Sequence, residues 1–160
     1  MCSSDLMYDA EVAPTDRARF RELVLQRAAG CPVAYLVGHK EFYSLTFEVG
    51  RDVLIPRPET EHLVGEALAF ARKSPVERFL DVGVGSGAIA VTLCVQWPAA
   101  RGLAVDRSPQ ALAVARRNAD RHGASDRLEF RESDLLSAVR AGERFDLIVS
   151  NPPYVRSEEH

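Results

Sequence analysis

Residues 79–88 read Phe79-Leu80-Asp81-Val82-Gly83-Val84-Gly85-Ser86-Gly87-Ala88. A short apolar run passes directly into closely spaced glycines, and an apolar segment follows at 88–96. Glycine adopts backbone conformations that other residues avoid, and it lets the main chain approach a ligand closely. We therefore predict a strand, a ligand-binding turn at 83–87 (the glycine turn) and a helix.

Two classes of ligand suit such a turn. Gly83, Gly85 and Ala88 satisfy the dinucleotide pattern G-x-G-x-x-G/A, so a nicotinamide-dependent dehydrogenase is one alternative. Asp81 argues against it, because a carboxylate beside the turn opposes a bound pyrophosphate. S-adenosylmethionine instead carries an ammonium and a sulfonium, which a nearby carboxylate attracts. The sequence therefore favours S-adenosylmethionine as the cofactor.

Two more acids fit a nucleoside at this edge of the sheet. Asp106 ends the next expected strand, and its two oxygens can accept hydrogen bonds from ribose hydroxyls. Asp134 follows the third strand, where it could reach the adenine amino group. Each acid could instead belong to a helix start, since Asp106 precedes Ser108 and Asp134 precedes an expected helix. The expected cofactor-binding residues are Asp81, Gly83, Val84, Gly85, Ser86, Gly87, Asp106 and Asp134.

The pattern around the glycine turn alternates between strands and helices. Strands are expected at 79–82, 103–105, 128–130 and 145–150, and helices at 88–96, 109–122 and 135–140. Ser108 followed by Pro109 is typical of a helix start. We expect an α/β fold with a Rossmann-like parallel sheet and helices on both faces, the last strand being central. Such sheets usually have five or more strands, so the sheet is expected to be incomplete.

The residues before this region divide into smaller elements. Helices are expected at 15–29, from Pro32 and at 59–73, and strands at 42–49 and 53–55 around a turn at 50–52. The expected domains are the remnant of a helical N-terminal domain at 1–38, a β-hairpin linker at 39–57 and the cofactor-binding domain at 58–160. Because an incomplete sheet exposes an apolar edge, we expect the 160-residue chain alone to be poorly stable and weakly active.

The tetrapeptide Asn151-Pro152-Pro153-Tyr154 follows the fourth strand. Prolines stiffen the backbone and donate no hydrogen bond, so the Asn151 side-chain oxygen and the Pro152 carbonyl can both act as acceptors. Two acceptors on the N–H bonds of an amide would direct its lone pair at a methyl donor and stabilise the developing charge. Tyr154 could stack on the planar group. A plain turn is the alternative interpretation; we favour a catalytic site of Asn151, Pro152 and Tyr154.

Composition narrows the function. The net charge of −3 argues against binding to a phosphate backbone, so direct nucleic-acid binding is not expected. Neither the cysteines nor the histidines have metal-ligand spacing, and no metal is expected; these residues are Cys2, Cys31, Cys94, His39, His62, His122 and His160. We see neither a membrane-length apolar run nor a signal peptide, so a cytoplasmic protein is expected.

These residues resemble a known family. The Asn-Pro-Pro-Tyr signature at 151–154 is similar to that of amino methyltransferases acting on planar nitrogens of nucleobases or glutamine. The stretches 38–43 (GHKEFY) and 54–61 (LIPRPETE) look like the peptide chain release factor N5-glutamine methyltransferases, and the resemblance extends over about 17–155. It implies a helical N-terminal domain, a β-hairpin linker and a seven-strand S-adenosylmethionine-dependent methyltransferase domain.

The resemblance also implies roles for single residues. Leu135 would flank the adenine, and Asn151 would contact both cofactor and substrate. Residues 151–154, with Pro153 included, would hold the glutamine of the Gly-Gly-Gln loop of release factors, the implied protein partner. The similar ribosomal-protein-L3 methyltransferases lack the continuation at 57–61, which favours the release-factor branch. Arg57, Glu59 and Thr60 would either lie near the cofactor or simply start a helix.

Other functions stay open at this point. A ribosomal-protein glutamine or a nucleic-acid adenine or guanine amino methyltransferase would use the same chemistry. A non-catalytic S-adenosylmethionine-binding module would use only the glycine turn.

Overall fold

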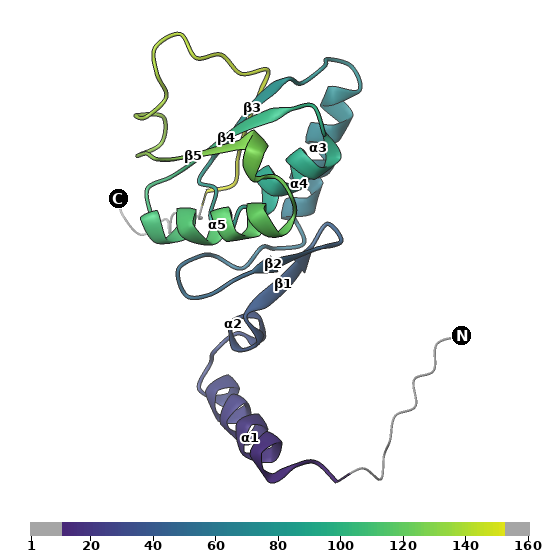
Figure 1. Cartoon of the computed structure of the whole chain (residues 1–160), viewed down its shortest axis with the longest axis vertical. Coiled ribbons are helices and arrows are strands. Elements are labelled where there is room, and N and C mark those ends of the chain that lie inside the picture. The colour runs from purple at the N-terminus through teal and green to yellow at the C-terminus, as the bar shows by residue number, and fades with distance from the viewer. Residues whose placement is uncertain (1–10, 153–160) are drawn as a thin grey trace, which may run out of the picture. The chain divides into compact units, whose positions relative to one another are not determined.

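The computed structural model describes residues 11–152, which fall into two units divided after Val37 (Figure 1). The first unit contains α1 (Pro14–Ala28) and α2 (Val33–Val37). Both helices were expected, and Pro14 at the start of α1 suits a position whose N–H has no helical partner. The apolar face of α1 is exposed, with Phe20 68% accessible.

The second unit opens with a β-hairpin that differs from the prediction. β1 (His39–Phe42) pairs antiparallel with β2 (Leu45–Glu48) across Tyr43 and Ser44. Both turn residues have left-handed backbone conformations, with φ of 49° and 61°. Two-residue hairpin turns of this kind normally use Asn or Gly, so the sequence lacked the signal. The prediction of one strand over 42–49 and another at 53–55 was therefore wrong.

The main sheet has four parallel strands among the described residues, in the order β5-β4-β3-β6. They are β3 (Arg78–Val82), β4 (Arg101–Asp106), β5 (Leu128–Glu132) and β6 (Leu147–Ser150). The predicted Rossmann-like α/β class is confirmed. In the part of the sheet described, β6 is an edge strand, not a central one, and its Ile148 is 57% exposed.

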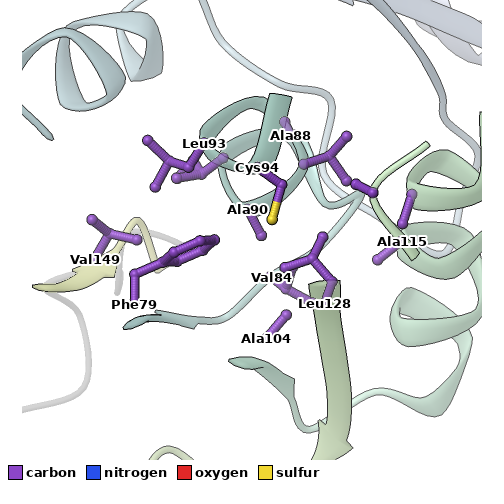
Figure 2. Close-up of a cluster of buried hydrophobic side chains, with 14 of the residues drawn as sticks. Phe79, Val84, Ala88, Ala90, Leu93, Cys94, Ala104, Ala115, Leu128 and Val149 are labelled. Atoms are coloured by element: carbon purple, nitrogen blue, oxygen red, sulfur yellow. The ribbon is translucent and has the colours of Figure 1, made fainter. Parts of the chain in front are cut away.

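Three helices cover one face of this sheet, namely α3 (Thr60–Ala71), α4 (Ala88–Gln96) and α5 (Pro109–Arg121). α4 is apolar nearly all round because it lies between the sheet and the other two helices. Figure 2 shows Leu93 and Cys94 of α4 facing the side chains of the sheet, including Phe79. The side chain of Ser108 accepts a hydrogen bond from Ala111 N at 3.2 Å, so the predicted start of α5 is confirmed. A short 3-10 turn (Ser125–Arg127) follows α5.

The other face is covered differently from the prediction. Its buried side chains on β3 and β4 contact Val139 and Phe145 from the loop before β6. No helix forms at 135–140, so the expectation of helices on both faces is not met within residues 11–152. The Ser133 hydroxyl donates to Leu135 O and accepts from Ala138 N, and such local bonds compete with a helix. In the described region no helix is long and apolar enough to cross a membrane.

Candidate functional site

The glycine turn joins β3 to α4 at the carboxyl edge of the sheet. Gly83, Gly85 and Gly87 all have left-handed φ values, of 79°, 53° and 84°. A Cβ atom added at Gly83 or Gly85 would meet nothing within 4 Å, so both glycines border open space. A Cβ at Gly87 would lie 3.2 Å from Ala115 Cβ, so this glycine permits close packing of α5. The first two glycines thus leave room for a ligand and the third serves packing.

Asp106 ends β4 and holds the turn from the side. Its Oδ2 accepts from Gly85 N at 2.9 Å, and its Oδ1 accepts from Ser108 N at 3.0 Å. The two interpretations of this acid, a ligand contact and a helix-start contact, are therefore compatible. Each carboxylate oxygen has two lone pairs, so each can still accept a hydrogen bond from a ribose hydroxyl group.

Asp81 lies beneath the glycine turn and is 1% exposed. Its Oδ2 accepts from Ala90 N at 3.1 Å, whereas Oδ1 has no hydrogen-bond partner among the described residues. Burial, together with the charge of Asp106, raises the pKa of Asp81 to about 7. A bound cation would favour the ionised form of such a carboxyl. The acids at this turn therefore fit the cationic ligand that the sequence favours, although Asp81 would act through its charge, not an exposed contact.

The loop after β5 borders the same edge. Ser133 N donates to Asp106 O at 2.9 Å, which places Asp134 and Leu135 next to the end of β4. Leu135 is 68% exposed and has a φ of 50°, which is uncommon for a residue with a branched side chain. An exposed apolar side chain held in a strained conformation suits contact with a flat apolar group, as the resemblance implies.

Arg131 fixes this loop, and the sequence analysis missed it. Its guanidinium contacts Glu143 at 2.7 Å and Glu129 at 2.6 Å, and it donates to Ala138 O at 3.1 Å. Ion pairing with Arg131 lowers the pKa of Glu143 to about 2. Charged residues alternate along β5, and this pattern did not indicate that Arg131 would pair with a residue of the following loop.

Asn151 and Pro152 follow β6, which lies directly beside β3. Because parallel strands end at one edge, the glycine turn and the start of the tetrapeptide lie at the same edge of the sheet. Asn151 and Pro152 are exposed there, and Asn151 Nδ2 donates to Thr60 Oγ1 at 2.8 Å. The predicted residues Pro153 and Tyr154 lie outside the described residues.

Asn118 on α5 supports the glycine turn from within the core, and the sequence analysis missed this residue too. Its side chain donates to Ser86 O at 2.8 Å and to Glu48 O at 3.0 Å, and accepts from Glu48 N at 2.7 Å. The fully buried carboxamide thereby provides hydrogen-bond partners for backbone groups of both β2 and the glycine turn. A polar residue on the apolar face of an amphipathic helix was the available signal.

The chain is similar in sequence to two protein families and to several curated proteins. The PrmC N-terminal domain family matches residues 4–38, and the methyltransferase small domain family matches residues 63–160. A release factor glutamine methyltransferase of Koribacter versatilis is 49% identical over 147 residues, 92% of this chain and 52% of that protein. One of Cereibacter sphaeroides is 50% identical over 146 residues, 91% of this chain and 50% of that protein. The predicted resemblance is confirmed, and the chain spans about half the length of these relatives.

A solved structure agrees in fold. A ribosomal protein L11 methylase from Lactobacillus delbrueckii subsp. bulgaricus gives a TM-score of 0.53 at 28% identity, covering 65% of this chain and 51% of that one. The methyltransferase match extends from α3 past the end of β6, and so includes the glycine turn, Asp106 and Asn151. Since 63–160 is more than half of the 160 residues, the chain belongs to the methyltransferase small domain family.

Proposed function

We propose that the protein containing this chain transfers a methyl group from S-adenosylmethionine to the side-chain amide N5 of a glutamine in peptide chain release factors. The observation that carries the proposal is the placement of Asn151 after β6, beside the strand that leads into the glycine turn. The relatives named release factor glutamine methyltransferase support the choice of substrate. The target would be the glutamine of the Gly-Gly-Gln loop.

The cofactor would be held by the edge of the sheet. S-adenosylmethionine, when bound, supplies a methyl group on a positively charged sulfur. The open backbone at Gly83 and Gly85 would admit close approach of the cofactor, and the oxygens of Asp106 would accept hydrogen bonds from the ribose hydroxyls. Asp81 contributes negative charge from below. Asp134 and Leu135 would border the adenine.

The substrate amide would be held by the tetrapeptide. The lone pair of an amide nitrogen is delocalised, so the amide must be oriented before it can attack. Asn151 Oδ1 and the Pro152 carbonyl would accept hydrogen bonds from the two N–H groups of the amide. These bonds would direct the nitrogen lone pair at the methyl group and stabilise the positive charge that develops on nitrogen. The nitrogen loses its extra proton after transfer, so this site needs no strong base. Tyr154 would stack against the planar amide.

The rest of the organisation follows from this assignment. Residues 1–38 would belong to the helical substrate-binding domain, 39–57 would form the hairpin linker and 58–160 would belong to the methyltransferase domain. The acidic net charge of −3 is consistent with a protein substrate and argues against direct nucleic-acid binding. Translation termination would place the protein in the cytoplasm.

Labelled-methyl transfer by the whole protein tests this function. Four substrates are offered in parallel: a purified release factor, its Gln→Ala loop variant, a ribosomal protein and duplex DNA. Label on the wild-type release factor alone is expected. Asn151→Ala should abolish most methyl transfer while leaving much of the binding of S-adenosylhomocysteine, as measured by calorimetry. Label on DNA or on the ribosomal protein would replace the proposed substrate, and binding without transfer to any of them would indicate a non-catalytic module.

A further inference from the structure

The segment 55–61 belongs to the stretch that carries the family resemblance, and it leads into the first turn of α3. It does start a helix, since Thr60 N donates to Arg57 O and Glu61 N donates to Pro58 O, both at 3.0 Å. The Thr60 hydroxyl takes no part in capping that helix. The N-cap residue is Glu59, which has a helical conformation and makes no side-chain cap bond.

The Thr60 hydroxyl instead reaches the tetrapeptide. Thr60 Oγ1 accepts from Asn151 Nδ2 at 2.8 Å, across 91 positions of sequence. Thr60 is half-buried, whereas Asn151 is exposed, so Thr60 is the more restrained of the two side chains. α3 also packs against β6, the strand that leads into Asn151. The hydrogen bond therefore joins an ordered helix start to an exposed side chain.

The neighbouring residue fixes this helix start from a second side. Glu61 Oε1 accepts from Tyr43 N, in the turn of the β-hairpin, at 2.8 Å. Tyr43 has a left-handed backbone conformation, and the carboxylate satisfies its N–H at that turn. The hydroxyl that contacts Asn151 is thus carried by a turn of helix that is itself held in place.

We propose that Thr60 is a positioning residue that anchors the nitrogen end of the Asn151 carboxamide. A side-chain amide turns about its last torsion between orientations that exchange its donor and acceptor ends. With Nδ2 engaged by Thr60, Oδ1 is left as the acceptor for an N–H bond of the substrate. An unanchored carboxamide spends time with its NH₂ group toward the substrate, where two donors oppose each other. The inference deepens the proposed function and depends on it for the catalytic role of Asn151.

The test compares Thr60→Val, which keeps the shape but removes the hydroxyl, with Thr60→Ser, which keeps the hydroxyl. Both are measured in the whole protein beside Asn151→Ala and the double variant Thr60→Val/Asn151→Ala. The readouts are kcat and KM for the release factor, the affinity for S-adenosylhomocysteine and the urea unfolding midpoint. A further readout is the pair of Asn151 side-chain NH₂ signals in the nitrogen–proton NMR spectrum, which are identified by their loss in Asn151→Ala. This measurement can be made without substrate.

Thr60→Val should lower kcat roughly three- to tenfold, the effect of one net hydrogen bond, with cofactor affinity and unfolding midpoint unchanged. Thr60→Ser should restore kcat, and Thr60→Val should have no further effect once Asn151 is Ala. The Asn151 NH₂ signals should move in Thr60→Val and not in Thr60→Ser. An unchanged kcat, or a loss that follows stability or cofactor affinity, would overturn the inference. If the wild type methylates no release factor, the proposed function fails, and unmoved NH₂ signals would reject the anchor separately.

Discussion

Replacing Asn118 by Ala should remove three hydrogen bonds that join the hairpin to the glycine turn. The two bonds to Glu48 have the geometry of a strand partner, one accepting from N and one donating to O. The third satisfies the carbonyl of Ser86 within the turn. Because Asn118 is fully buried, Ala leaves three backbone groups unpaired, together with a small cavity.

The size of the loss follows from the burial of those groups. An unpaired buried polar group costs about 1–3 kcal/mol. Ser86 is 4% exposed, so leaving its carbonyl unpaired accounts for most of the loss. Glu48 is half-buried, so water can partly replace the hydrogen bonds of its N–H and carbonyl groups. We therefore expect the free energy of unfolding to fall by about 3 kcal/mol, rather than the full sum of three such penalties.

Arg117→Ala is the matched control, since Arg117 precedes Asn118 on α5 and also binds Glu48. Its guanidinium lies 2.7 Å from Glu48 Oε1 and its side chain is 52% exposed. Exposed ion pairs contribute about 0.2–1 kcal/mol, so Arg117→Ala should be the milder change. Both variants remove a contact with β2, but only Asn118→Ala also releases the turn.

Urea unfolding of the whole protein, followed by far-ultraviolet circular dichroism, measures both losses. Calorimetric titration with S-adenosylhomocysteine then reports the state of the turn. Asn118→Ala should lower both the unfolding free energy and the affinity, whereas Arg117→Ala should leave the affinity unchanged. If Asn118→Ala costs no more than Arg117→Ala, the three hydrogen bonds do not stabilise the fold and the reasoning is refuted.

Three further substitutions test the site and the sheet. Burial raises the pKa of Asp81 from 3.8 to about 7, so the folded protein binds this proton more tightly than the unfolded chain does, and stability falls as pH rises from about 4 to about 7. Asp81→Asn should flatten the pH dependence of the urea midpoint across that window, and an unchanged slope would contradict this. Gly102→Ala places a Cβ 2.5 Å from Phe79 Cζ and 2.6 Å from Leu128 Cδ2, so thermal unfolding should show a loss of about 1–3 kcal/mol; an unshifted melting temperature would count against the packing described. Gly85→Ala puts an alanine at a φ of 53°, which should lower the free energy of unfolding by about 1–2 kcal/mol. The added methyl group should also weaken binding of S-adenosylhomocysteine, and an affinity equal to that of the wild type would contradict this.

The core of the fold was predictable because its signals are local. An apolar run before closely spaced glycines predicted β3 and α4, and Ser108 before Pro109 predicted the start of α5. The hairpin was not predictable, because Tyr43 and Ser44 form its turn without the residues that usually do so. The expected helix at 135–140 failed for a comparable reason, since the Ser133 hydroxyl takes backbone groups that a helix would need.

The candidate site shows the same division. Asp106 and Asn151 were placed correctly at strand ends because parallel strands bring distant residues to one edge. The side chains that support them were not, because contacts such as Asn118 with Glu48 and Thr60 with Asn151 join residues far apart in sequence. Nothing in one sequence fixes which pairs of polar side chains meet.

The hairpin contributes to the site as well as connecting two parts of the chain. At its turn, Tyr43 N is held by Glu61, whose neighbour Thr60 contacts Asn151. At its other end, Glu48 is held by Asn118, which also holds the glycine turn. One short antiparallel pair is therefore linked through Asn118 to the turn that would bind the cofactor, and through α3 to the residue that would orient the substrate. Loss of the hairpin should consequently impair both functions, even though none of its residues needs to touch either ligand.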